Sequence, residues 1–287
     1  MDLELAALAA VAGGVAARMF YRDDAMDIRH KRPGDPVTEA DHAANDAILD
    51  VLRSGASADP VRSEESKPLR AAAGAFPRLW VVDPLDGTKE FIARNGEFAM
   101  MVGLAVDGAS RLGAVLKPDP GRLYLGLAVG GAWVADVVWA GEVDTGGFDA
   151  VVGPFAPLRL PDTRPGTLRI TRSRSHPDPL ITTVAERLGA ESVLSGSVGV
   201  KCSMIAEGRA DVYVHPVAFL KEWDTCAPEA VLRGAGGRVT DCAGRRLDYG
   251  KPDPVQPRGI FAARPDTWEA ALPLVREVTA AKLEFDS

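Results

Sequence analysis

The sequence has little cysteine, and the cysteines it has form no recognisable pattern. Cys202, Cys226 and Cys242 are the three cysteines among 287 residues. Their number is odd and no two of them stand in a Cys-x-x-Cys pair, so they fit neither a disulfide framework nor a zinc site. The simplest expectation is a reduced, cytoplasmic setting.

An excess of positive charge is also missing. The formal net charge is −7, whereas nucleic-acid binding depends on lysine and arginine side chains that neutralise phosphates. A nucleic-acid partner is therefore not expected. An anionic ligand would need cations placed locally.

Long hydrophobic runs are absent as well. The Ala-rich stretch over residues 1–20 carries Asp2 and Glu4 where an export signal has basic residues, and its apolar run is too short to span a bilayer. It predicts an amphipathic helix. With 46% hydrophobic and 25% charged residues, the composition is typical of a soluble globular protein without a membrane partner.

The elements predicted for the first half are helices and an antiparallel sheet. A polar loop over residues 30–37 precedes a helix that Thr38 caps, in which apolar residues recur at helical spacing. Residues 79–82 form a short strand. The runs within residues 97–134 are separated by turn residues, which indicates an antiparallel meander.

The second half predicts an α/β pattern. The Gly/Pro-rich stretch over residues 141–166 marks a subdomain boundary. Beyond it strands and helices alternate, with one helix over residues 225–235 and another closing the chain. The length fits one large domain, with subdomains over about residues 1–150 and 165–287.

Four short acidic stretches are the candidates for chemistry. They are TEAD with Asp41, SEES with Glu64 and Glu65, DPLDGT with Asp83 and Asp86, and EWDT with Asp224. Each has an alternative explanation when taken singly. Asp41 fits a capping box opened by Thr38, Asp224 could cap a helix, the SEES glutamates could be solvated loop charges, and DPLDGT could be a surface turn.

The combination of these stretches favours a metal site. Asp83 is predicted to end a strand, while Asp86 and Asp224 stand where helices are predicted to begin. The first N–H groups of a helix are free and can bind a phosphate. If Glu64 joins these three, carboxylates about 4 Å apart would repel by roughly 4 kcal/mol per pair at an effective dielectric near 20. Divalent cations would keep them ionised.

The donor set indicates which cation and which reaction. Oxygen ligands without histidine or cysteine favour Mg²⁺ or Mn²⁺ over Zn²⁺. Two or three such ions can bind a phosphate ester, lower the pKa of a bound water and stabilise the leaving oxygen. The sequence therefore predicts hydrolysis of a small-molecule phosphate ester.

The motifs resemble those of the inositol monophosphatase superfamily, the lithium-sensitive, Mg²⁺-dependent phosphatases. DPLDGT and EWDTCAPEAVLRGAGG look like its two signature motifs, and TEAD and SEES stand where the family has its other acidic motifs. The resemblance covers nearly the whole chain in the right order. It implies an α/β class fold with α-β-α-β-α layers, in which residues 1–287 form a single catalytic domain.

The resemblance also implies the roles of individual residues. The family's metal ligands correspond to Glu64, Asp83, the carbonyl of Leu85, Asp86 and Asp224. Thr88 would pair with Asp41 to activate the attacking water, with Glu64 as a further catalytic residue. Gly87 and Thr88 would bind the phosphate through their N–H groups, and Asp224 would also contact the substrate.

The residues after DPLDGT suggest which ester is cut. DGTKEFIARNGEF resembles the 3'(2'),5'-bisphosphate nucleotidases of sulfate assimilation (CysQ type), which have Lys-Glu-Phe where inositol monophosphatases have a string like Thr-Asn-Phe. That subgroup removes the 3'-phosphate from 3'-phosphoadenosine 5'-phosphate and leaves AMP. The implied substrate is a nucleoside bisphosphate, and inhibition by Li⁺ is expected.

Two further stretches resemble that subgroup and imply substrate contacts. Ser175 and His176 would contact the nucleotide, while Gly196, Ser197 and Lys201 would line the pocket for its sugar and second phosphate. His176 could instead be a loop histidine bonded to a neighbouring backbone group. Lys201 could instead be a solvated helix charge.

One residue departs from the family's pattern, and two other functions stay open. Cys226 stands where the family usually has a small Ala-like residue, and a thiol beside Asp224 would make activity sensitive to oxidation. The chain could be an inositol, sugar or histidinol monophosphatase. It could also be a non-catalytic metal- and nucleotide-binding regulator, although no acidic ligand is missing. A homodimer is compatible with the sequence.

Overall fold

The computed structural model describes residues 1–21, 26–32, 34–67, 69, 76–139, 152–162, 166–216 and 219–283. The helices are α1 (Asp2–Arg18), α2 (Glu39–Gly55), α3 (Thr88–Ile92), α4 (Pro179–Leu188), α5 (Val198–Ala206), α6 (Glu222–Gly234) and α7 (Pro265–Leu283). None of them, within this described part of the chain, is long and apolar enough to cross a lipid bilayer.

The strands form two large sheets and one separate hairpin. The seven-stranded sheet has sequential order: β3 (Val61–Ser63), β4 (Arg78–Asp86), β5 (Ala99–Val106), β6 (Ala109–Lys117), β7 (Arg122–Leu127), β8 (Gly131–Asp136) and β9 (Ala156–Leu158). Its strands are antiparallel from β4 onward, while β3 and β4 are parallel. The predicted antiparallel meander is confirmed.

The second sheet has five strands and a mixed pattern. They are β10 (Arg169–Ser173), β11 (Glu191–Ser195), β12 (Val212–His215), β13 (Arg238–Thr240) and β14 (Ile260–Ala263), in the spatial order β11-β10-β12-β14-β13. β10 is parallel to both β11 and β12, and β14 is antiparallel to both β12 and β13. The predicted α/β alternation of the second half is confirmed.

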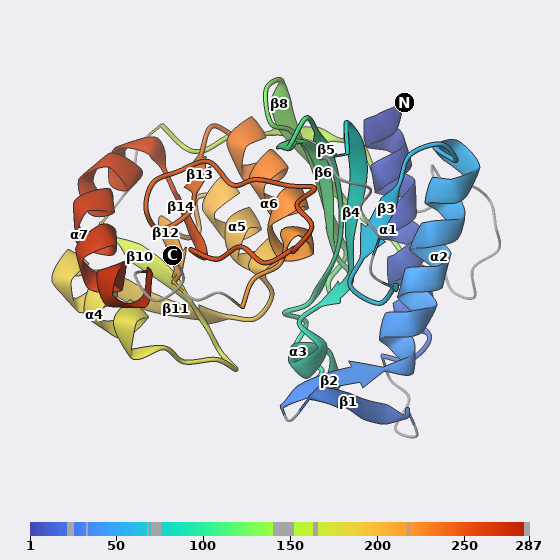
Figure 1. Cartoon of the computed structure of the whole chain (residues 1–287), viewed down its shortest axis with the longest axis horizontal. Coiled ribbons are helices and arrows are strands. Elements are labelled where there is room, and N and C mark those ends of the chain that lie inside the picture. The colour runs from blue at the N-terminus through green and yellow to red at the C-terminus, as the bar shows by residue number, and fades with distance from the viewer. Residues whose placement is uncertain are drawn as a thin grey trace.

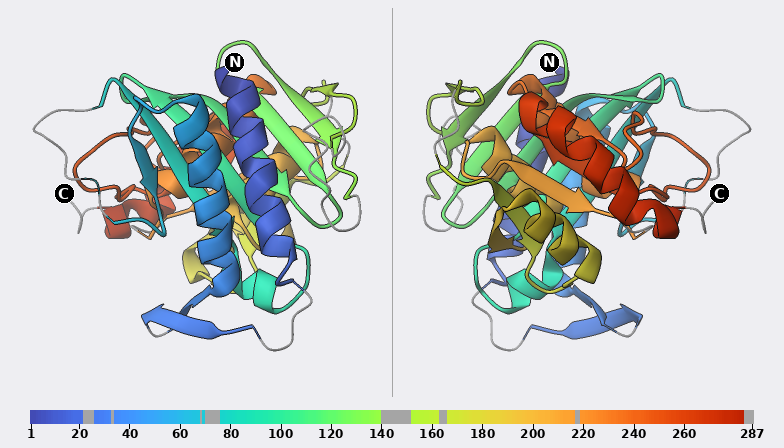
Figure 2. Two further views of the ribbon diagram at one scale, coloured as in Figure 1. Left: turned by 90° about the vertical axis from the view of Figure 1, so that its right-hand side faces the viewer. Right: turned by 90° about the vertical axis from the view of Figure 1, so that its left-hand side faces the viewer.

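Helices and sheets stack in five layers (Figure 1). The order runs from α4 and α7 through the five-stranded sheet, α5 and α6, and the seven-stranded sheet to α1 and α2. Figure 2 shows α1 and α2 side by side on one outer face and α7 with α4 on the other. The α-β-α-β-α order and the α/β class are confirmed.

Three hydrophobic cores fill the spaces between the layers. β4 shows how one strand contributes to two of them: Leu79 and Val81 face the core shared with α5 and α6, while Trp80 and Val82 face the core shared with α1 and α2. Successive side chains of a strand point to opposite faces, so a strand covered on both faces is apolar throughout. The third core packs α4 and α7 against the five-stranded sheet.

Two glycines let α6 lie close to the seven-stranded sheet. A Cβ atom added at Gly113 of β6 would stand 2.5 Å from the Cα of Ala227, and one at Gly126 of β7 would stand 2.3 Å from the Cα of Val231. Any side chain at these positions would push α6 away, because the obstacle is backbone. The close approach fixes the first turn of α6, which carries Asp224.

The prediction of a polar loop over residues 30–37 is wrong. Within this range, residues 30–32 belong to β1 (Ile28–Arg32) and residues 35–37 to β2 (Asp35–Thr38), and the two strands pair antiparallel as a hairpin. All five residues of β1 are exposed, and in β2 only Val37 and Thr38 are buried, so β1 has no hydrophobic alternation to mark it. The strand β3 was likewise missed, since only its last two residues are buried.

Two predicted boundaries also need correction. The strand expected over residues 79–82, with Asp83 at its end, is β4 and continues to Asp86. The helix expected over residues 225–235 is α6 and begins three residues earlier, at Glu222. In both cases the strand or helix is longer than its apolar residues indicate, because polar residues of the motif also belong to it.

The predicted boundary over residues 141–166 falls largely outside the described residues. Within its described part, β9 pairs with β8 and so belongs to the seven-stranded sheet. The strands from β10 onward belong to the other sheet. The division into subdomains over about residues 1–150 and 165–287 stays a prediction.

Candidate active site

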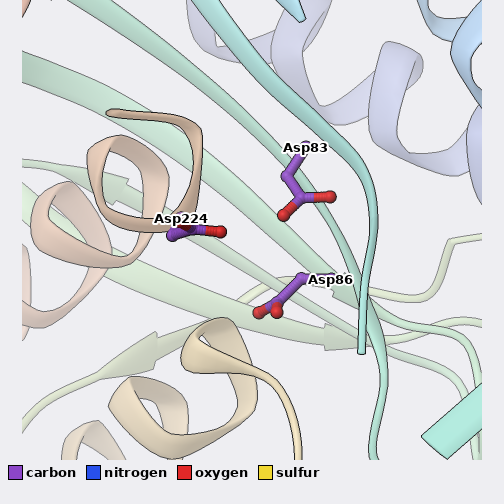
Figure 3. Close-up of side chains that lie close together, drawn as sticks. All are labelled: Asp83, Asp86 and Asp224. Carbon is purple, nitrogen blue, oxygen red and sulfur yellow. The ribbon is translucent and has the colours of Figure 1, made fainter. Parts of the chain in front are cut away.

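Three carboxylates meet between the end of β4 and the first turn of α6 (Figure 3). Asp83 and Asp86 come from β4 and Asp224 comes from α6, and each offers a carboxylate oxygen within 4.8 Å of the others. Asp83 is buried and the other two are half-buried. Three of the four carboxylates expected to converge are thus brought together.

An irregularity in β4 aims both of its aspartates at the same site. Asp83 pairs with Met101 of β5 and Asp86 pairs with Ala99, so three steps along β4 correspond to two along β5. Residues three apart in a regular strand point to opposite faces, and one extra residue removes that alternation. The N–H of Leu85 donates to the Asp83 carboxylate at 3.1 Å, which holds this segment in place.

Burial and repulsion by neighbouring carboxylates raise the pKa values of Asp83 and Asp224. The pKa of Asp83 is raised well above its usual range, first by burial and then by Glu64, Asp86 and Asp224. The pKa of Asp224 is raised in the same way, first by burial and then by Asp86 and Glu64. A bound divalent cation would offset both effects, because it stabilises the ionised form.

Asp224 combines this position with the capping role that was its alternative. It is the third residue of α6, and its carboxylate accepts a hydrogen bond from the Lys221 N–H at 2.5 Å. The bond uses one carboxylate oxygen and leaves the other toward the cluster. Helix capping therefore orients the group and does not replace its part in the site.

Asp41 likewise combines two roles that the sequence presented as alternatives. Its Oδ2 accepts hydrogen bonds from the N–H and the hydroxyl of Thr38, at 2.8 and 2.7 Å, which closes the capping box of α2. Its Oδ1 accepts a hydrogen bond from the Thr88 hydroxyl at 2.9 Å. The pKa of Asp41 is raised, chiefly by burial. The two side chains expected to act together on water are in contact.

Glu64 lies near the three carboxylates but outside their 4.8 Å group. Its Oε1 accepts a hydrogen bond from the Lys31 ammonium of β1 at 2.9 Å, and the same ammonium contacts Glu65. Burial, opposed by Lys31, raises the pKa of Glu64 to about 7. The alternative of solvated loop charges is wrong, since both glutamates are paired.

The beginning of α5 holds Asp86. The Asp86 Oδ2 accepts hydrogen bonds from the Ser197 hydroxyl at 2.6 Å and from the Gly199 N–H at 3.1 Å. Lys201 is 3% exposed, and its ammonium donates to the Gly196 carbonyl at 3.0 Å. The alternative of a solvated Lys201 is therefore wrong. Of the three residues expected to line the substrate pocket, Ser197 contacts the carboxylate cluster directly, and Lys201 contacts Gly196 next to it.

The Lys-Glu-Phe string contacts the loop that was expected to bind the nucleotide. The Lys89 ammonium lies 2.9 Å from Nε2 of His176, and the Ser175 hydroxyl donates to the Glu90 carboxylate. His176 is thus bonded to a side chain of α3, not to a neighbouring backbone group. The Lys-Glu-Phe string, which indicated the substrate, therefore contacts both residues that were expected to bind the nucleotide.

Sequence reasoning missed charged residues that support the site. Lys31 stood in a segment read as a loop. Arg62 and Glu222 form a buried ion pair, with Nη1 and Oε2 2.6 Å apart and exposures of 6% and 0%. Each stands two positions before an expected metal ligand, but 160 residues separate them, so no local pattern could pair them.

The thiol beside Asp224 is poorly suited to oxidation. Cys226 is fully buried and packs against Gly103 of β5. Its pKa is raised well above the usual value, first by burial and then by Glu229. Because the thiolate is the reactive form, the structure argues against the expected oxidation sensitivity.

Comparison with known proteins identifies the family. The model of the inositol monophosphatase family matches residues 2–280. The chain belongs to this family. A family member from Escherichia coli K12, 3'(2'),5'-bisphosphate nucleotidase CysQ, is 36% identical to it over 84% of this chain and 91% of its own length. The 3'-phosphoadenosine 5'-phosphate phosphatase of Mycobacterium leprae is 32% identical over 83% of this chain and 81% of its own.

Solved structures of the inositol monophosphatase family share the fold. The crystal structure of CysQ from Bacteroides thetaiotaomicron has a TM-score of 0.76 and 33% identity, covering 92% of this chain and 97% of that one. An inositol monophosphatase from Anabaena has a TM-score of 0.71 over 96% and 95% of the two chains, at 23% identity. The second likeness concerns the fold alone, whereas the first joins fold and sequence.

Proposed function

We propose that this chain is a Mg²⁺-dependent 3'(2'),5'-bisphosphate nucleotidase that hydrolyses 3'-phosphoadenosine 5'-phosphate to AMP and phosphate. The observation that carries the proposal is the convergence of Asp83, Asp86 and Asp224 in a chain of the inositol monophosphatase family. The substrate is supported by relatives at 32–36% identity whose names state this activity. The contacts of Lys89 and Glu90 with the loop of Ser175 and His176 agree with it.

The donor set fits the metal that the family implies. The three clustered side chains supply only carboxylate oxygens, which are the ligands of hard cations such as Mg²⁺ and Mn²⁺. Glu64 and the carbonyl of Leu85 would complete the set for two or three ions. When bound, the ions would neutralise the phosphate, lower the pKa of the attacking water and stabilise the leaving oxygen.

Asp41 and Thr88 would receive the proton that the attacking water loses. The Thr88 hydroxyl already donates to Asp41 at 2.9 Å, so it can pass its own proton to Asp41 while it takes one from the water. Burial raises the pKa of Asp41, which makes its carboxylate a stronger base. The water oxygen bonds to phosphorus as the bond from phosphorus to the ribose 3'-oxygen breaks, and the 3'-oxygen takes up a proton from solvent to become the hydroxyl group of AMP.

Residues around this pair would hold the substrate. Gly87, which has a φ of 98°, and Thr88 begin α3 and would direct their N–H groups at the 3'-phosphate. Ser175 and His176 would contact the nucleotide. Gly196, Ser197 and the buried Lys201 would form the wall facing the sugar and the 5'-phosphate, where the lysine charge favours an anion.

A substrate panel tests this proposal. With Mg²⁺, we expect kcat/KM for 3'-phosphoadenosine 5'-phosphate to exceed that for inositol 1-phosphate by at least about tenfold, since contacts to a second charged group contribute roughly 1.5–3 kcal/mol. Phosphate release measured with and without Li⁺ should show inhibition. A preference for inositol 1-phosphate would contradict the proposed substrate but not the proposed metal-dependent hydrolysis. If no phosphate is released from any ester, the chain would instead be a non-catalytic regulator.

Lys31 is expected to compete with the metal for Glu64. Its ammonium occupies the carboxylates of Glu64 and Glu65, so metal binding at Glu64 has to displace it. We expect Lys31→Met to lower the Mg²⁺ concentration for half-maximal activity by about twofold to fivefold, the worth of a partly exposed ion pair. Arg29→Met is the control on the same strand, because Arg29 pairs with Asp27. An unchanged or higher Mg²⁺ requirement in Lys31→Met would rule out the competition.

The setting of the enzyme is proposed on the same resemblance. We propose a cytoplasmic enzyme of sulfate assimilation, acting on a soluble phosphate ester. A homodimer stays a prediction. Cell fractionation and growth of a deletion strain on sulfate, with and without a supplied reduced sulfur source, test the setting.

A further inference from the structure

A second pocket lies away from the carboxylate cluster and has the opposite charge. Its volume is about 520 Å³. Its charged lining consists of Lys117, Arg122, Arg159, Arg209 and the single carboxylate Glu207. Tyr124, Pro120, Pro157 and Leu158 provide the apolar part. Four cations against one carboxylate make this a cationic pocket, in a chain whose net charge is −7.

The ion pairs of this pocket involve Arg122 and Arg209 and leave two of its cations unpaired. Glu207 accepts hydrogen bonds from Arg122 at 3.2 Å, from the Tyr124 hydroxyl at 2.9 Å and from Arg209 at 3.3 Å. Arg122 also donates to Asp136 at 2.7 Å. Within the described part of the chain, the side chains of Lys117 and Arg159 make no hydrogen bond or ion pair. Burial, and then the nearby Arg209, lower the pKa of Lys117, while Asp119, Glu97 and Glu207 oppose this shift without pairing with the ammonium.

The pocket is separated from the proposed catalytic site by the length of α5. Ser197 and Gly199 at the start of this helix donate to Asp86, while Glu207, directly after its last residue, lines the pocket. Nine residues at about 1.5 Å each place the two ends roughly 13 Å apart. One substrate phosphate at the carboxylate cluster therefore does not account for the cations of this pocket.

We propose that this pocket binds a small organic anion carrying at least two phosphate groups, independently of the catalytic metal. Guanidinium groups recognise phosphate oxygens bidentately, and an ammonium adds a point charge. The volume lies in the range of small-molecule sites and exceeds what two phosphate groups need. The tyrosine, proline and leucine side chains would cover the organic part of the ligand.

Binding of inorganic pyrophosphate, ADP and adenosine to the full-length protein in EDTA tests the proposal. Without metal the carboxylate cluster repels anions, so binding reports cationic sites. Calorimetry should give a Kd below about 1 mM for pyrophosphate and for ADP, and no binding of adenosine. In Lys117→Met/Arg159→Met both affinities should fall at least tenfold.

Two control variants locate the binding. Arg53→Met/Arg187→Met removes the same charge from exposed positions elsewhere and should leave both affinities within twofold. Lys89→Met removes a cation of α3 that contacts His176, at the proposed catalytic site and not at this pocket, and should do the same. Pyrophosphate that binds the Lys117/Arg159 variant as tightly as the parent protein, or does not bind the parent protein, would overturn the proposal. The unfolding midpoint of each variant shows that it is folded. Failure here leaves the proposed nucleotidase activity untouched.

Discussion

Asp86→Asn is expected to lower kcat/KM for phosphate release by about 10³-fold or more. Its carboxylate is one of three within 4.8 Å of one another, and the stabilisation that such ligands provide through a metal amounts to several kcal/mol of the barrier. The asparagine carbonyl can still accept the hydrogen bonds from Ser197 and Gly199. The decrease in kcat/KM should therefore come from weaker metal binding and not from a change in the fold. Steady-state assays across a Mg²⁺ titration measure it.

The metal-free stability of the same variant separates a metal site from a structural cluster. Ionised carboxylates about 4.8 Å apart repel by roughly 3–4 kcal/mol per pair at an effective dielectric near 20, so removing one should raise the free energy of unfolding in EDTA. Added MgCl₂ should stabilise the parent protein and not Asp86→Asn. Urea unfolding with and without Mg²⁺ gives both values, and Asp224→Asn should behave alike.

The matched control for the active-site aspartates is Asp50→Asn. Asp50 lies on α2, its side chain is 80% exposed, and it pairs only loosely with Arg53 at 3.7 Å. We expect its activity to stay within twofold of the parent. If Asp86→Asn unfolds in EDTA, or keeps its activity, the cluster serves the fold and not the chemistry.

Glu222→Gln is expected to destabilise the protein by about 3–5 kcal/mol. Glu222 is fully buried and ion-paired with Arg62 at 2.6 Å, and it accepts hydrogen bonds from the N–H groups of Gly250 and Lys251, each at 3.0 Å. A neutral glutamine leaves the buried guanidinium of Arg62 without a counter-charge, which is the costly way to break such a pair. Urea unfolding at fixed Mg²⁺ measures the change.

A double variant distinguishes the uncompensated charge from lost packing. In Arg62→Met/Glu222→Gln neither charge remains, so most of the lost stability should return. Glu277→Gln breaks the exposed pair with Arg187 and should leave the unfolding midpoint unchanged. A double variant no more stable than Glu222→Gln would show that the charge is not the cause.

The same pair has a consequence for catalysis. Arg62 stands two residues before Glu64, and Glu222 stands two residues before Asp224, so the pair joins β3 to the first turn of α6. Breaking it should raise the Mg²⁺ requirement as well as lower stability. We therefore expect the pair to position the proposed metal ligands Glu64 and Asp224 without itself touching metal or substrate.

Much of the site was determined by the sequence alone. Asp83 and Asp86 stand in one short motif, and Asp41 and Asp224 occupy capping positions next to helices, so local patterns sufficed to select them. The layers followed from the resemblance, while the meander and the α/β alternation followed from turn spacing and apolar periodicity. Short stretches of chain determine these features, because the spacing of apolar side chains and the position of turn residues specify each strand or helix within its own segment.

The tertiary structure decided what depends on distant partners. Lys31 reaches Glu64 from β1, whose five residues are all exposed, so the sequence of that strand carries no burial pattern. The Arg62–Glu222 pair joins residues 160 positions apart, and the cationic pocket gathers side chains from β6, β7, the segment after β9 and the end of α5. A charge is free or paired according to its neighbours in space, because Coulomb energy depends on distance and burial and not on sequence separation.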